Sequence, residues 1–392
     1  MAKLGELGAI ITGNTPKTSE PENYSSNDIC FVKPSDISDN EITYLTISEY
    51  YISEIARNTA RIVPPGSILV TCIGIIGKVA INQVECAFNQ QINAIVPNGD
   101  KCLTEYLAYA VQWGKAKMQK IANAPVVPIL NKTQFSEIEV KVPSLSEQRH
   151  VATVLNKVCN LIALRKQQLA KLDELVKARF VEMFGDPIDN PKGLPVKTLK
   201  ELSTLITNGN TPKGGSENYV DNGILFLRSQ NIWRNRIELD DVAYIDEATH
   251  RSLKKSSLKH KDILITKTGR INTENSSLGR AALYLGADDS ANINGHVYLV
   301  RLDGSVVPEY VVTILTSEAY RKYIRKVCVG GIDKRQINLD QVEDFPIILP
   351  SVEMQEQFAA FVKQTDKSKV AVQKALDEAQ LLFDSLMQQY FG

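Results

Sequence analysis

The chain has 392 residues, enough for two or three domains, and its 43% hydrophobic and 23% charged residues are typical of a globular protein rather than a disordered one. Its 45 Lys and Arg residues balance 45 Asp and Glu residues, so the net charge of +0 excludes a polybasic protein but permits a local basic face. The six cysteines are too sparse for a disulfide scaffold, the first ten residues lack a signal-peptide core, and the most apolar run, 68–76, is too short to span a membrane, so we expect a cytoplasmic protein.

The most informative feature is an internal repeat. Residues 10–24 read IITGNTPKTSEPENY and residues 205–219 read LITNGNTPKGGSENY, so Gly-Asn-Thr-Pro-Lys and Glu-Asn-Tyr occur in both. The other matching stretches are 66–74 with 261–269, 77–81 with 279–283, 88–96 with 293–300, and 140–148 with 347–355. The separation grows from 196 to 207 residues because the second copy carries extra residues around 270–278. The chain is therefore predicted to contain two copies of one module, each a globular part followed by a helix.

Within each globular part, short β-rich runs are separated by Gly, Pro and Asn, which predicts a small twisted sheet with long loops. Helical spacing follows at 103–122 and at 308–327. Each globular part is therefore expected to be α+β. The predicted strands are Ile29–Val32, Ser67–Thr71, Ala94–Val96, Ile224–Leu227, Ile263–Thr266 and Val297–Arg301.

The two tails carry heptad seams over 148–183 and 355–390, at matching positions 207 residues apart. About 38 helical residues would span roughly 57 Å at 1.5 Å per residue. The interrupting polar residues differ between the seams: Arg165 and Arg179 in the first, Thr365 and Lys369 in the second. We predict that the helices pair with each other and that these residues set the register, ordinary core helices being the alternative. The apolar seam residues are Val151, Leu155, Val158, Ile162, Leu169, Leu172, Val176, Phe358, Val362, Val372, Leu376, Phe383 and Leu386.

Motifs that carry a reaction are weak throughout. Gly74-Ile-Ile-Gly-Lys78 has the wrong glycine spacing for a phosphate-binding P-loop, and the four His are scattered without zinc-ligand spacing. Glu139-Val-Lys141 resembles a nuclease triplet but ends an apolar strand, and Pro21-Glu-Asn-Tyr24 lacks the paired prolines of a base-methyltransferase motif. The sequence therefore predicts no catalytic residue and no metal or cofactor bound by this chain.

Basic residues gather in the second copy despite the neutral total. One cluster runs from Arg251 to Arg280 and another from Arg321 to Arg335. Loops with Arg, Lys, Asn and Gln on a small sheet suit phosphate and base-edge contacts, whereas a solvated basic face is the alternative. The duplication favours DNA, because two similar modules on a rigid spacer can read two half-sites at a fixed separation.

These features together resemble type I restriction–modification specificity subunits. The repeated Gly-Asn-Thr-Pro-Lys resembles the start of their target-recognition domains, and the helix entry Pro-Ser-Leu-Ser-Glu-Gln (143–148) and the exit Phe-Gly-Asp-Pro-x-x-Asn-Pro-Lys-Gly (184–193) are similar too. The resemblance covers essentially the whole chain. It implies two α+β target-recognition domains, each a small twisted β-sheet plus helices, separated by two long antiparallel coiled-coil helices with a pseudo-twofold internal repeat. The implied divisions are target-recognition domain 1 at 1–143, a central spacer helix at 144–184, a linker at 185–195, target-recognition domain 2 at 196–349 and a C-terminal spacer helix at 350–392.

The resemblance also implies a non-catalytic subunit that reads a bipartite, asymmetric site in double-stranded DNA. Two modification subunits would dock on it, bind S-adenosylmethionine and methylate adenine after flipping the base out of the duplex. Two restriction subunits, with ATP and Mg²⁺, are a further expected partner. Three alternatives stay open: a coiled-coil scaffold without sequence-specific DNA binding, an enzyme with a hidden active site, and the specificity component of a related system.

The candidate DNA contacts are polar residues of the predicted loops. Pro16 and Pro212 are expected to shape the loops rather than touch DNA. In the first domain the candidates are Thr15, Lys17, Lys33, Ser35, Asn89, Gln90, Gln91 and Lys132. In the second domain they are Thr211, Lys213, Arg228, Ser229, Gln230, Asn231, Lys267, Arg270, Asn294, His296, Lys334 and Arg335.

Overall fold

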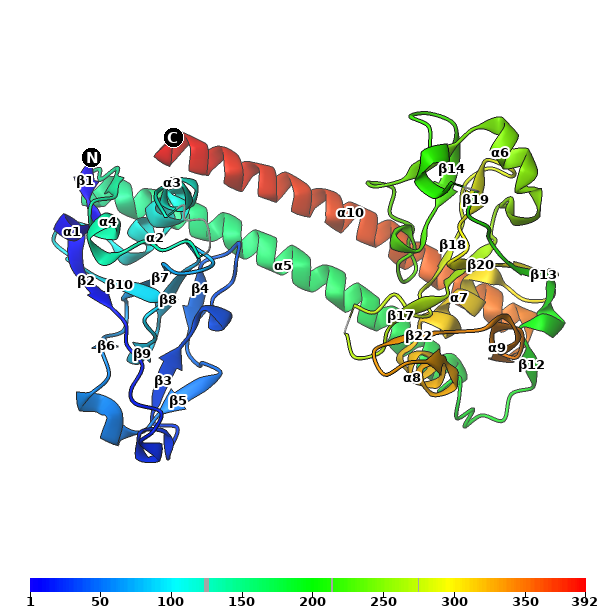
Figure 1. The fold of residues 1–392 in the computed structure, drawn as a ribbon, viewed down its shortest axis with the longest axis horizontal. Helices are drawn as coiled ribbons and strands as arrows, with labels where there is room; N and C mark the ends of the chain where they lie inside the picture. The colour runs from blue at the N-terminus through cyan, green and yellow to red at the C-terminus, as the bar shows by residue number, and fades with distance from the viewer. Residues whose placement is uncertain (123–126, 213, 274) are drawn as a thin grey trace. The chain divides into compact units, whose positions relative to one another are not determined.

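The computed structural model describes residues 1–122, 127–212, 214–273 and 275–392, and they form two compact units (Figure 1). Unit 1 comprises 1–166 and 373–392, and unit 2 comprises 167–372. Two long helices, α5 (Leu145–Phe184) and α10 (Val352–Phe391), contribute to both units. Each unit therefore combines one globular domain with the beginning of one long helix and the end of the other.

Unit 1 contains a five-stranded sheet of order β2-β10-β7-β8-β4, a four-stranded sheet of order β5-β3-β9-β6 and the pair β1-β11. The strands are β1 (Ala2–Lys3), β2 (Gly8–Thr12), β3 (Ile29–Val32), β4 (Thr43–Leu45), β5 (Tyr50–Ile52), β6 (Ile62–Val63), β7 (Ile68–Thr71), β8 (Val79–Asn82), β9 (Cys86–Phe88), β10 (Ile92–Pro97) and β11 (Glu139–Val140). The central strands β7 and β8 are buried along their whole length, as expected for runs without polar alternation.

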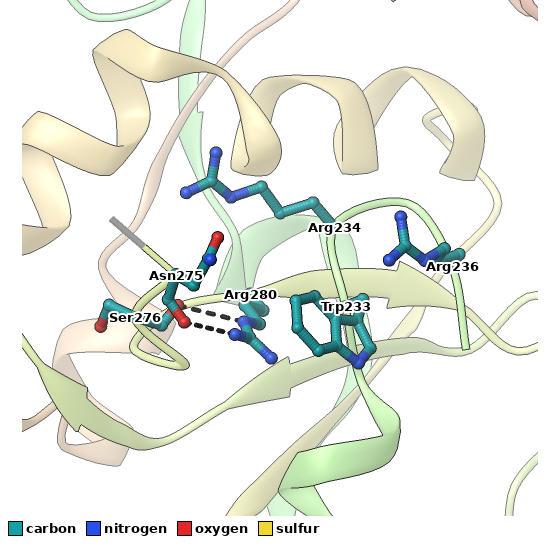
Figure 2. A pocket seen from close by; sticks show the side chains of 6 residues that line it. All are labelled: Trp233, Arg234, Arg236, Asn275, Ser276 and Arg280. Carbon is teal, nitrogen blue, oxygen red and sulfur yellow. Dashed lines mark hydrogen bonds between the residues drawn. The ribbon is translucent and has the colours of Figure 1, made fainter. Parts of the chain in front are cut away.

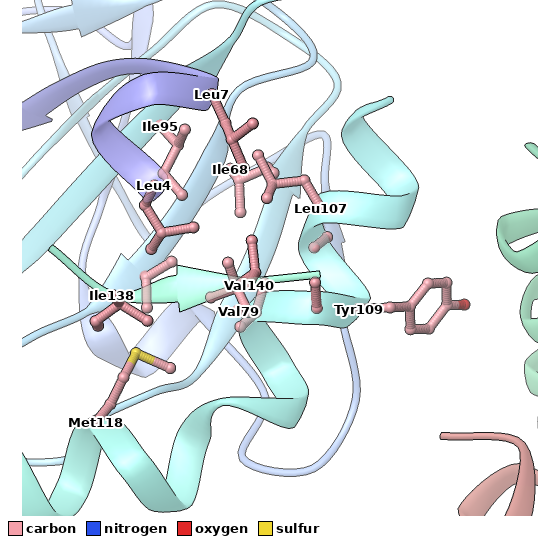
Figure 3. Close-up of a cluster of buried hydrophobic side chains, with 14 of the residues drawn as sticks. Leu4, Leu7, Ile68, Val79, Ile95, Leu107, Tyr109, Met118, Ile138 and Val140 are labelled. Carbon is pink, nitrogen blue, oxygen red and sulfur yellow. The ribbon is translucent and has the colours of Figure 1, made fainter. Parts of the chain in front are cut away.

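Four short helices, α1 (Leu4–Leu7), α2 (Thr104–Trp113), α3 (Lys115–Ile121) and α4 (Lys132–Ser136), complete the first domain. Its largest core joins the sheet to α1 and α2: Leu4, Ile68, Ile95 and Leu107 are all fully buried in it (Figure 3). Val151 and Leu155 of α5 and Met387 of α10 belong to the same core, so burial of apolar surface holds the domain to this part of the helix pair.

Unit 2 repeats this arrangement with sheets of order β13-β20-β16-β18 and β15-β14-β19, the pair β12-β23 and a further sheet β17-β22-β21. The strands are β12 (Val196–Thr198), β13 (Ser203–Asn208), β14 (Ile224–Leu227), β15 (Ala243–Ile245), β16 (Ile263–Thr266), β17 (Thr268–Arg270), β18 (Ala281–Leu283), β19 (Ala291–Ile293), β20 (Val297–Leu302), β21 (Val329–Gly330), β22 (Lys334–Gln336) and β23 (Pro346–Ile348). Each of the six strands predicted from sequence overlaps an observed strand.

The helices of the second domain are α6 (Glu247–Ser252), α7 (Pro308–Thr316), α8 (Glu318–Val327) and α9 (Leu339–Glu343). The stretches 103–122 and 308–327, predicted to be helical, each hold two helices rather than one. Ser317 separates α7 from α8 because its extended backbone ends the first helix while its hydroxyl caps the second by accepting the Tyr320 N–H. Gly114 separates α2 from α3.

The duplication extends to strand direction. In both domains the strands of the main sheet, β2·β10·β7·β8 and β13·β20·β16·β18, pair antiparallel in the same order. In both, a strand of the second sheet lies parallel to one neighbour and antiparallel to the other: β3 between β9 and β5, and β14 between β19 and β15. The sequence repeat is therefore a repeat of topology.

Matched side chains tie each domain to the start of its own long helix. The buried amide of Gln148 accepts the Leu103 N–H at 2.9 Å and donates to the Pro143 carbonyl at 2.9 Å. In the second domain Gln355 accepts the Val307 N–H at 3.0 Å and donates to the Pro350 carbonyl at 3.0 Å. A buried amide bonded on both sides fixes where each helix leaves its domain.

Matched aromatic residues tie each domain to the end of the other helix. In unit 1 Tyr106 of α2 packs against Phe391 of α10, with ring centroids 5.3 Å apart. In unit 2 Tyr310 of α7 packs against Phe184 of α5 at 5.0 Å. The beginning of one long helix thus lies beside the end of the other in each unit, so the helices run antiparallel there.

The apolar seam residues lie on the less exposed side of the two helices. Val151, Leu155, Val158 and Ile162 are buried in unit 1, and Phe358 is fully buried in unit 2. The remaining predicted seam residues are half-buried: Leu169, Leu172, Val176, Val362, Val372, Leu376, Phe383 and Leu386. Lys369 of α10 forms an ion pair with Asp173 of α5 at 2.7 Å, so one interrupting polar residue joins the two helices within unit 2.

Among the described residues no helix is long and apolar enough to cross a membrane.

Candidate nucleic-acid interface

The repeated Gly-Asn-Thr-Pro-Lys forms a loop that lies against the β9–β10 turn in unit 1. The N–H of Gly13 donates to the Ile92 carbonyl, and the N–H of Asn14 to the Phe88 carbonyl, both at 3.0 Å. A Cβ on Gly13 would lie only 2.2 Å from the Asn89 carbonyl oxygen, so only glycine fits this close approach.

Unit 2 builds the same loop against the β19–β20 turn. The N–H of Gly209 donates to the Val297 carbonyl at 3.0 Å, and a Cβ on Gly209 would lie 2.1 Å from the Ile293 carbonyl oxygen. The two glycines that begin the repeated motif therefore serve the same purpose. Each fixes a polar loop at the end of its main sheet, which leaves Thr15 and Thr211 exposed.

In unit 1 the structure brings four predicted contact residues together at this turn. The Thr15 hydroxyl donates to the Gln90 side chain at 2.7 Å, and the Asn89 amide donates to the Gln91 side chain at 2.8 Å. Asn89 is buried and Gln91 half-buried, whereas Gln90 is exposed. The exposed groups therefore include amide and hydroxyl groups that match base edges and phosphates.

The other candidates of unit 1 lie on separate elements. The Lys33 ammonium lies 3.2 Å from the centroid of the Tyr50 ring, a cation–π contact, and Ser35 follows it, exposed. Lys17 is exposed and pairs with Glu20 at 3.2 Å. Lys132 is the first residue of α4, a helix that packs against α1. The candidate contacts of unit 1 are therefore spread over several elements, of which the turn at 89–91 is one.

In unit 2 the loop after β14 holds four candidates. Arg228 pairs with Asp241 at 2.9 Å, and the exposed Gln230 donates to the same carboxylate at 2.6 Å. The Asn231 amide is buried and donates to the carbonyls of Glu238 and Asp241 at 3.0 and 2.7 Å, so it holds the loop together. Ser229 is half-buried at the start of the same turn.

Four basic residues lie on the sheet β17-β22-β21 or directly before its first strand. We call Lys267, Arg270, Lys334 and Arg335 the basic arm. Strand pairing places Arg270 opposite Lys334 and Gly269 opposite Arg335. Arg270 is exposed and pairs with Asp333 at 3.3 Å, while the Lys267 ammonium lies 5.7 Å from the Tyr298 ring centroid.

The arm adjoins the turn that carries the last two candidates. The Lys267 N–H donates to the His296 carbonyl at 2.8 Å, and the Asn294 side chain accepts the His296 N–H at 3.1 Å. His296 is exposed and Asn294 half-buried. The arm and the β19–β20 turn therefore form one polar surface in unit 2. Lys213 lies outside the described residues.

Sequence reasoning missed one basic site. Trp233, Arg234, Arg236, Asn275, Ser276 and Arg280 line a cavity of about 220 Å³, which we call the arginine pocket (Figure 2). The Arg280 guanidinium lies 3.8 Å from the Trp233 ring centroid. Burial, and then the positive charge of Arg234, lower the pKa of Arg280 from its ordinary value. The alignment of 77–81 with 279–283 could have revealed this pocket, because it places Arg280 opposite Lys78 and so marks a basic residue at the same position of both copies.

Among the described residues no group of three or more His, Cys, Asp or Glu side chains could hold a metal ion. The polar groups described above are donors and acceptors spread over loop surfaces, which suits recognition of an extended polar partner rather than enclosure of a small ligand.

Comparison with known proteins identifies the family of the chain. The family model described as "Type I restriction modification DNA specificity domain" matches residues 1–174 and again 191–379. The chain is 26% identical to the type I restriction enzyme MjaIX specificity subunit of Methanocaldococcus jannaschii, over 98% of this chain and 90% of that protein. It is 21% identical to the StySPI specificity subunit of Salmonella potsdam, over 99% of this chain and 86% of that protein.

Solved structures give the same fold. The S subunit of a type I restriction–modification system from M. genitalium aligns with a TM-score of 0.57 at 12% identity, covering 100% of this chain and 95% of that one. A chain from a study of complex assembly in the type I system aligns with a TM-score of 0.58 at 16% identity, covering 99% and 96%. With a family model matched by both halves, the chain belongs to the type I restriction–modification DNA specificity family and is a specificity subunit of such a system.

Proposed function

We propose that each domain of this chain reads one half of a bipartite, asymmetric sequence in double-stranded DNA, and that the chain itself catalyses no reaction. The observation that supports this most directly is a duplicated framework with divergent surface chemistry. The glycine loops, the sheet topology and the helix anchors match in the two domains, whereas the exposed side chains around them differ.

The difference in side chains supports different base preferences. The turn of unit 1 presents the amide of Gln90 beside Thr15, and amides bond well to adenine. The matching surface of unit 2 presents His296 and the basic arm, where Arg270 and Arg335 offer the paired donors that suit guanine. Two unlike halves make the whole site asymmetric.

The proposed partners are two modification subunits and, in a complete system, two restriction subunits. Exposed leucines on the long helices, Leu161 and Leu164 of α5 and Leu381 and Leu382 of α10 in unit 1, offer apolar surface for docking. The modification subunits would hold S-adenosylmethionine, and the restriction subunits ATP and Mg²⁺. Since the chain has a net charge of +0, we propose that its partners supply much of the affinity for DNA phosphates.

The decisive experiment is a map of methylated adenines. The chain is co-expressed with the modification subunit encoded beside it, in a host that lacks DNA methylation, and the genome is sequenced for modified bases. We expect a split motif with two defined ends and a fixed gap. A motif with one defined end would contradict the reading of DNA by both domains. An assembled complex that modifies nothing would favour a scaffold instead.

A second experiment tests the proposal that the partner subunits supply much of the affinity for DNA phosphates. The chain alone and the chain with modification subunits are titrated with a duplex that carries the motif, at physiological salt. We expect weak binding by the chain alone and tight binding by the complex. Specific nanomolar binding by the isolated chain would overturn the idea that the partners supply the phosphate affinity.

A further inference from the structure

Lys78 of unit 1 and Arg280 of unit 2 occupy the same position of the repeat. Each follows a glycine at the start of matched strands β8 and β18. The Lys78 N–H donates to the Thr71 hydroxyl at 3.0 Å, and the Arg280 N–H donates to the Thr266 hydroxyl at 2.9 Å. Both side chains are almost fully buried, each residue being 8% exposed. The duplication therefore provides two versions of one buried cation for comparison.

In unit 1 the chain itself neutralises this cation. The Lys78 ammonium donates to the carbonyls of Pro34 and Ile37 at 3.2 and 3.0 Å and pairs with the Asp39 carboxylate at 3.1 Å. A buried ammonium has three donors, and all three find acceptors here. Nothing in this arrangement calls for an external anion.

In unit 2 an arginine stands where unit 1 has that carboxylate. The turns match: the Lys33 N–H is accepted by Asp36 at 2.7 Å, as the Arg228 N–H is by Asn231 at 2.9 Å. The next residue in each turn is an isoleucine, and the residue two places after it is Asp39 in unit 1 and Arg234 in unit 2. An acid that neutralises the buried cation is thus replaced by a second cation.

Among the described residues, no carboxylate forms an ion pair with Arg234 or Arg280 in the arginine pocket. Arg280 donates to the backbone carbonyls of Ser276, at 3.0 Å, and Asn275, while its guanidinium covers the Trp233 ring (Figure 2). Glu238 pairs with Arg236 at 2.7 Å, but no acidic side chain of the described ranges pairs with Arg234 or Arg280.

One residue that lines the pocket also carries an unused hydrogen-bond donor. The indole N–H of Trp233 is buried and has no acceptor among the described residues. A buried donor without a partner is costly, and such groups in a pocket point to a ligand that accepts hydrogen bonds.

From these contacts we infer that the arginine pocket binds one backbone phosphate of the DNA, a contact that unit 1 does not make at its matched position. The inference rests on the proposed function, because it names a contact within the same recognition. A phosphate diester is an anion with only acceptor oxygens, so it matches guanidinium and indole donors, whereas base edges carry donors as well. The contact positions the second domain on the duplex without reading sequence.

The test changes Arg234, which is exposed and can be replaced without opening the core. Arg234→Ala removes one cation. Arg234→Asp places a carboxylate near Arg280, as Asp39 lies near Lys78 in unit 1. Lys197→Ala is the matched control, since it removes one exposed positive charge of unit 2 outside the pocket. The full chain is assembled with its modification subunits and titrated with two DNA duplexes of equal length at a series of salt concentrations. One duplex carries the motif found by methylation mapping, and the other is unrelated in sequence.

For Arg234→Ala we expect roughly tenfold weaker binding of both duplexes, because a charge-assisted bond to phosphate is lost. The slope of log affinity against log salt should fall by about 0.9, the value for one phosphate. Arg234→Asp should weaken binding at least as much while the unfolding midpoint is kept or raised, and Lys197→Ala should match the wild-type complex.

Two results would overturn the inference. An unchanged salt slope would mean that the pocket contacts no phosphate, and a loss confined to the motif duplex would mean a base contact. The proposed function fails in a different way, namely if the wild-type complex binds both duplexes equally. In that case a reduced slope for Arg234→Ala would still support phosphate binding in the pocket.

Discussion

The two domains differ in the segments that follow the matched strands β7 and β16. In unit 1 a β-bridge between Ile73 and Ile129 joins the segment after β7 to the segment before α4, and Ile75 and Ile129 are 55% and 50% exposed. In unit 2 the matching pair, Thr268 and Gln336, belongs to the three-stranded sheet that carries the basic arm. One copy presents apolar side chains at the place where the other presents arginine and lysine.

This contrast shows which parts of a duplicated recognition domain are free to change. Contacts that allow no change of geometry are kept in both copies. One is a glycine at which an added Cβ would lie 2.1–2.2 Å from a carbonyl oxygen, and the other is a buried glutamine amide bonded to backbone groups on both sides. Exposed strands and loops carry no such constraint, so their side chains can diverge and give each domain its own chemistry.

The largest expected effect is on how firmly the two domains hold the helix pair. Phe358 is fully buried against Phe180, Phe184 and Tyr310, whereas its matched residue in unit 1 is Val151. Phe358→Ala should lower the free energy of unfolding of unit 2 by about 3–5 kcal/mol, and Val151→Ala that of unit 1 by only about 2 kcal/mol. Urea unfolding of each variant measures its loss in free energy of unfolding. Equal losses in the two variants would contradict the expectation that Phe358 contributes more to stability than Val151.

A second pair of variants breaks one half of the site at a time. In Gly13→Ala and Gly209→Ala the new Cβ would lie 2.2 and 2.1 Å from carbonyl oxygens, so the loop must shift at a cost of about 1–3 kcal/mol. Methylation mapping should show that each variant loses preference for a different half of the motif. Gly99→Ala, with open space around it, is the control. Loss of the same half by both variants would refute the assignment of one half to each domain.

The repeated motifs predicted the architecture because they record constraints that leave a mark in sequence. The heptad spacing from Gln148 and from Gln355 anticipated both long helices, and the β-rich runs anticipated strands such as β3 and β16. Short strands such as β4 and β6, of three and two residues, carry too little periodicity to be recognised.

The site was harder to predict because its chemistry depends on partners distant in sequence. The residues 270–278 were expected to be extra loop, and the described residues 271–273 and 275–278 do lie outside helices and strands. The sequence did not reveal that β17, the strand that ends at Arg270, pairs with β22 some 65 residues later. Similarly, the charge at Arg234 has meaning only when the matched Asp39 and the buried cation beside it are known. The composition of the chain reveals neither the pairing of β17 with β22 nor the match between Arg234 and Asp39.

Arg270→Ala sharpens the contrast between the arm and its apolar counterpart. The Arg270 side chain is exposed and forms an ion pair with Asp333 at 3.3 Å, and an exposed pair of this kind contributes little, so its removal should leave stability nearly unchanged. We expect roughly tenfold weaker or relaxed recognition of one half-site, as for the loss of one base contact. The other half-site keeps its sequence preference. Methylation mapping gives the result, and an unaltered motif together with unaltered affinity would remove Arg270 from the interface.

The smallest expected effect comes from placing the charge of unit 2 into unit 1. In Asp39→Arg the ammonium of Lys78 keeps its two carbonyl acceptors but loses its carboxylate and gains a nearby cation. Because Asp39 is 60% exposed, solvent screens the change, and we expect a loss of stability of no more than about 1 kcal/mol.

The same variant tests whether an arginine at this position is enough to make a phosphate contact. Unit 1 has Ser38 where unit 2 has Trp233, so it lacks the indole that Arg280 covers and the unused N–H donor. If the phosphate contact needs this whole arrangement, Asp39→Arg should leave the salt slope of DNA binding unchanged although the net charge has risen by two. A slope that rises by about 0.9 would instead show that the added charge alone recruits a phosphate.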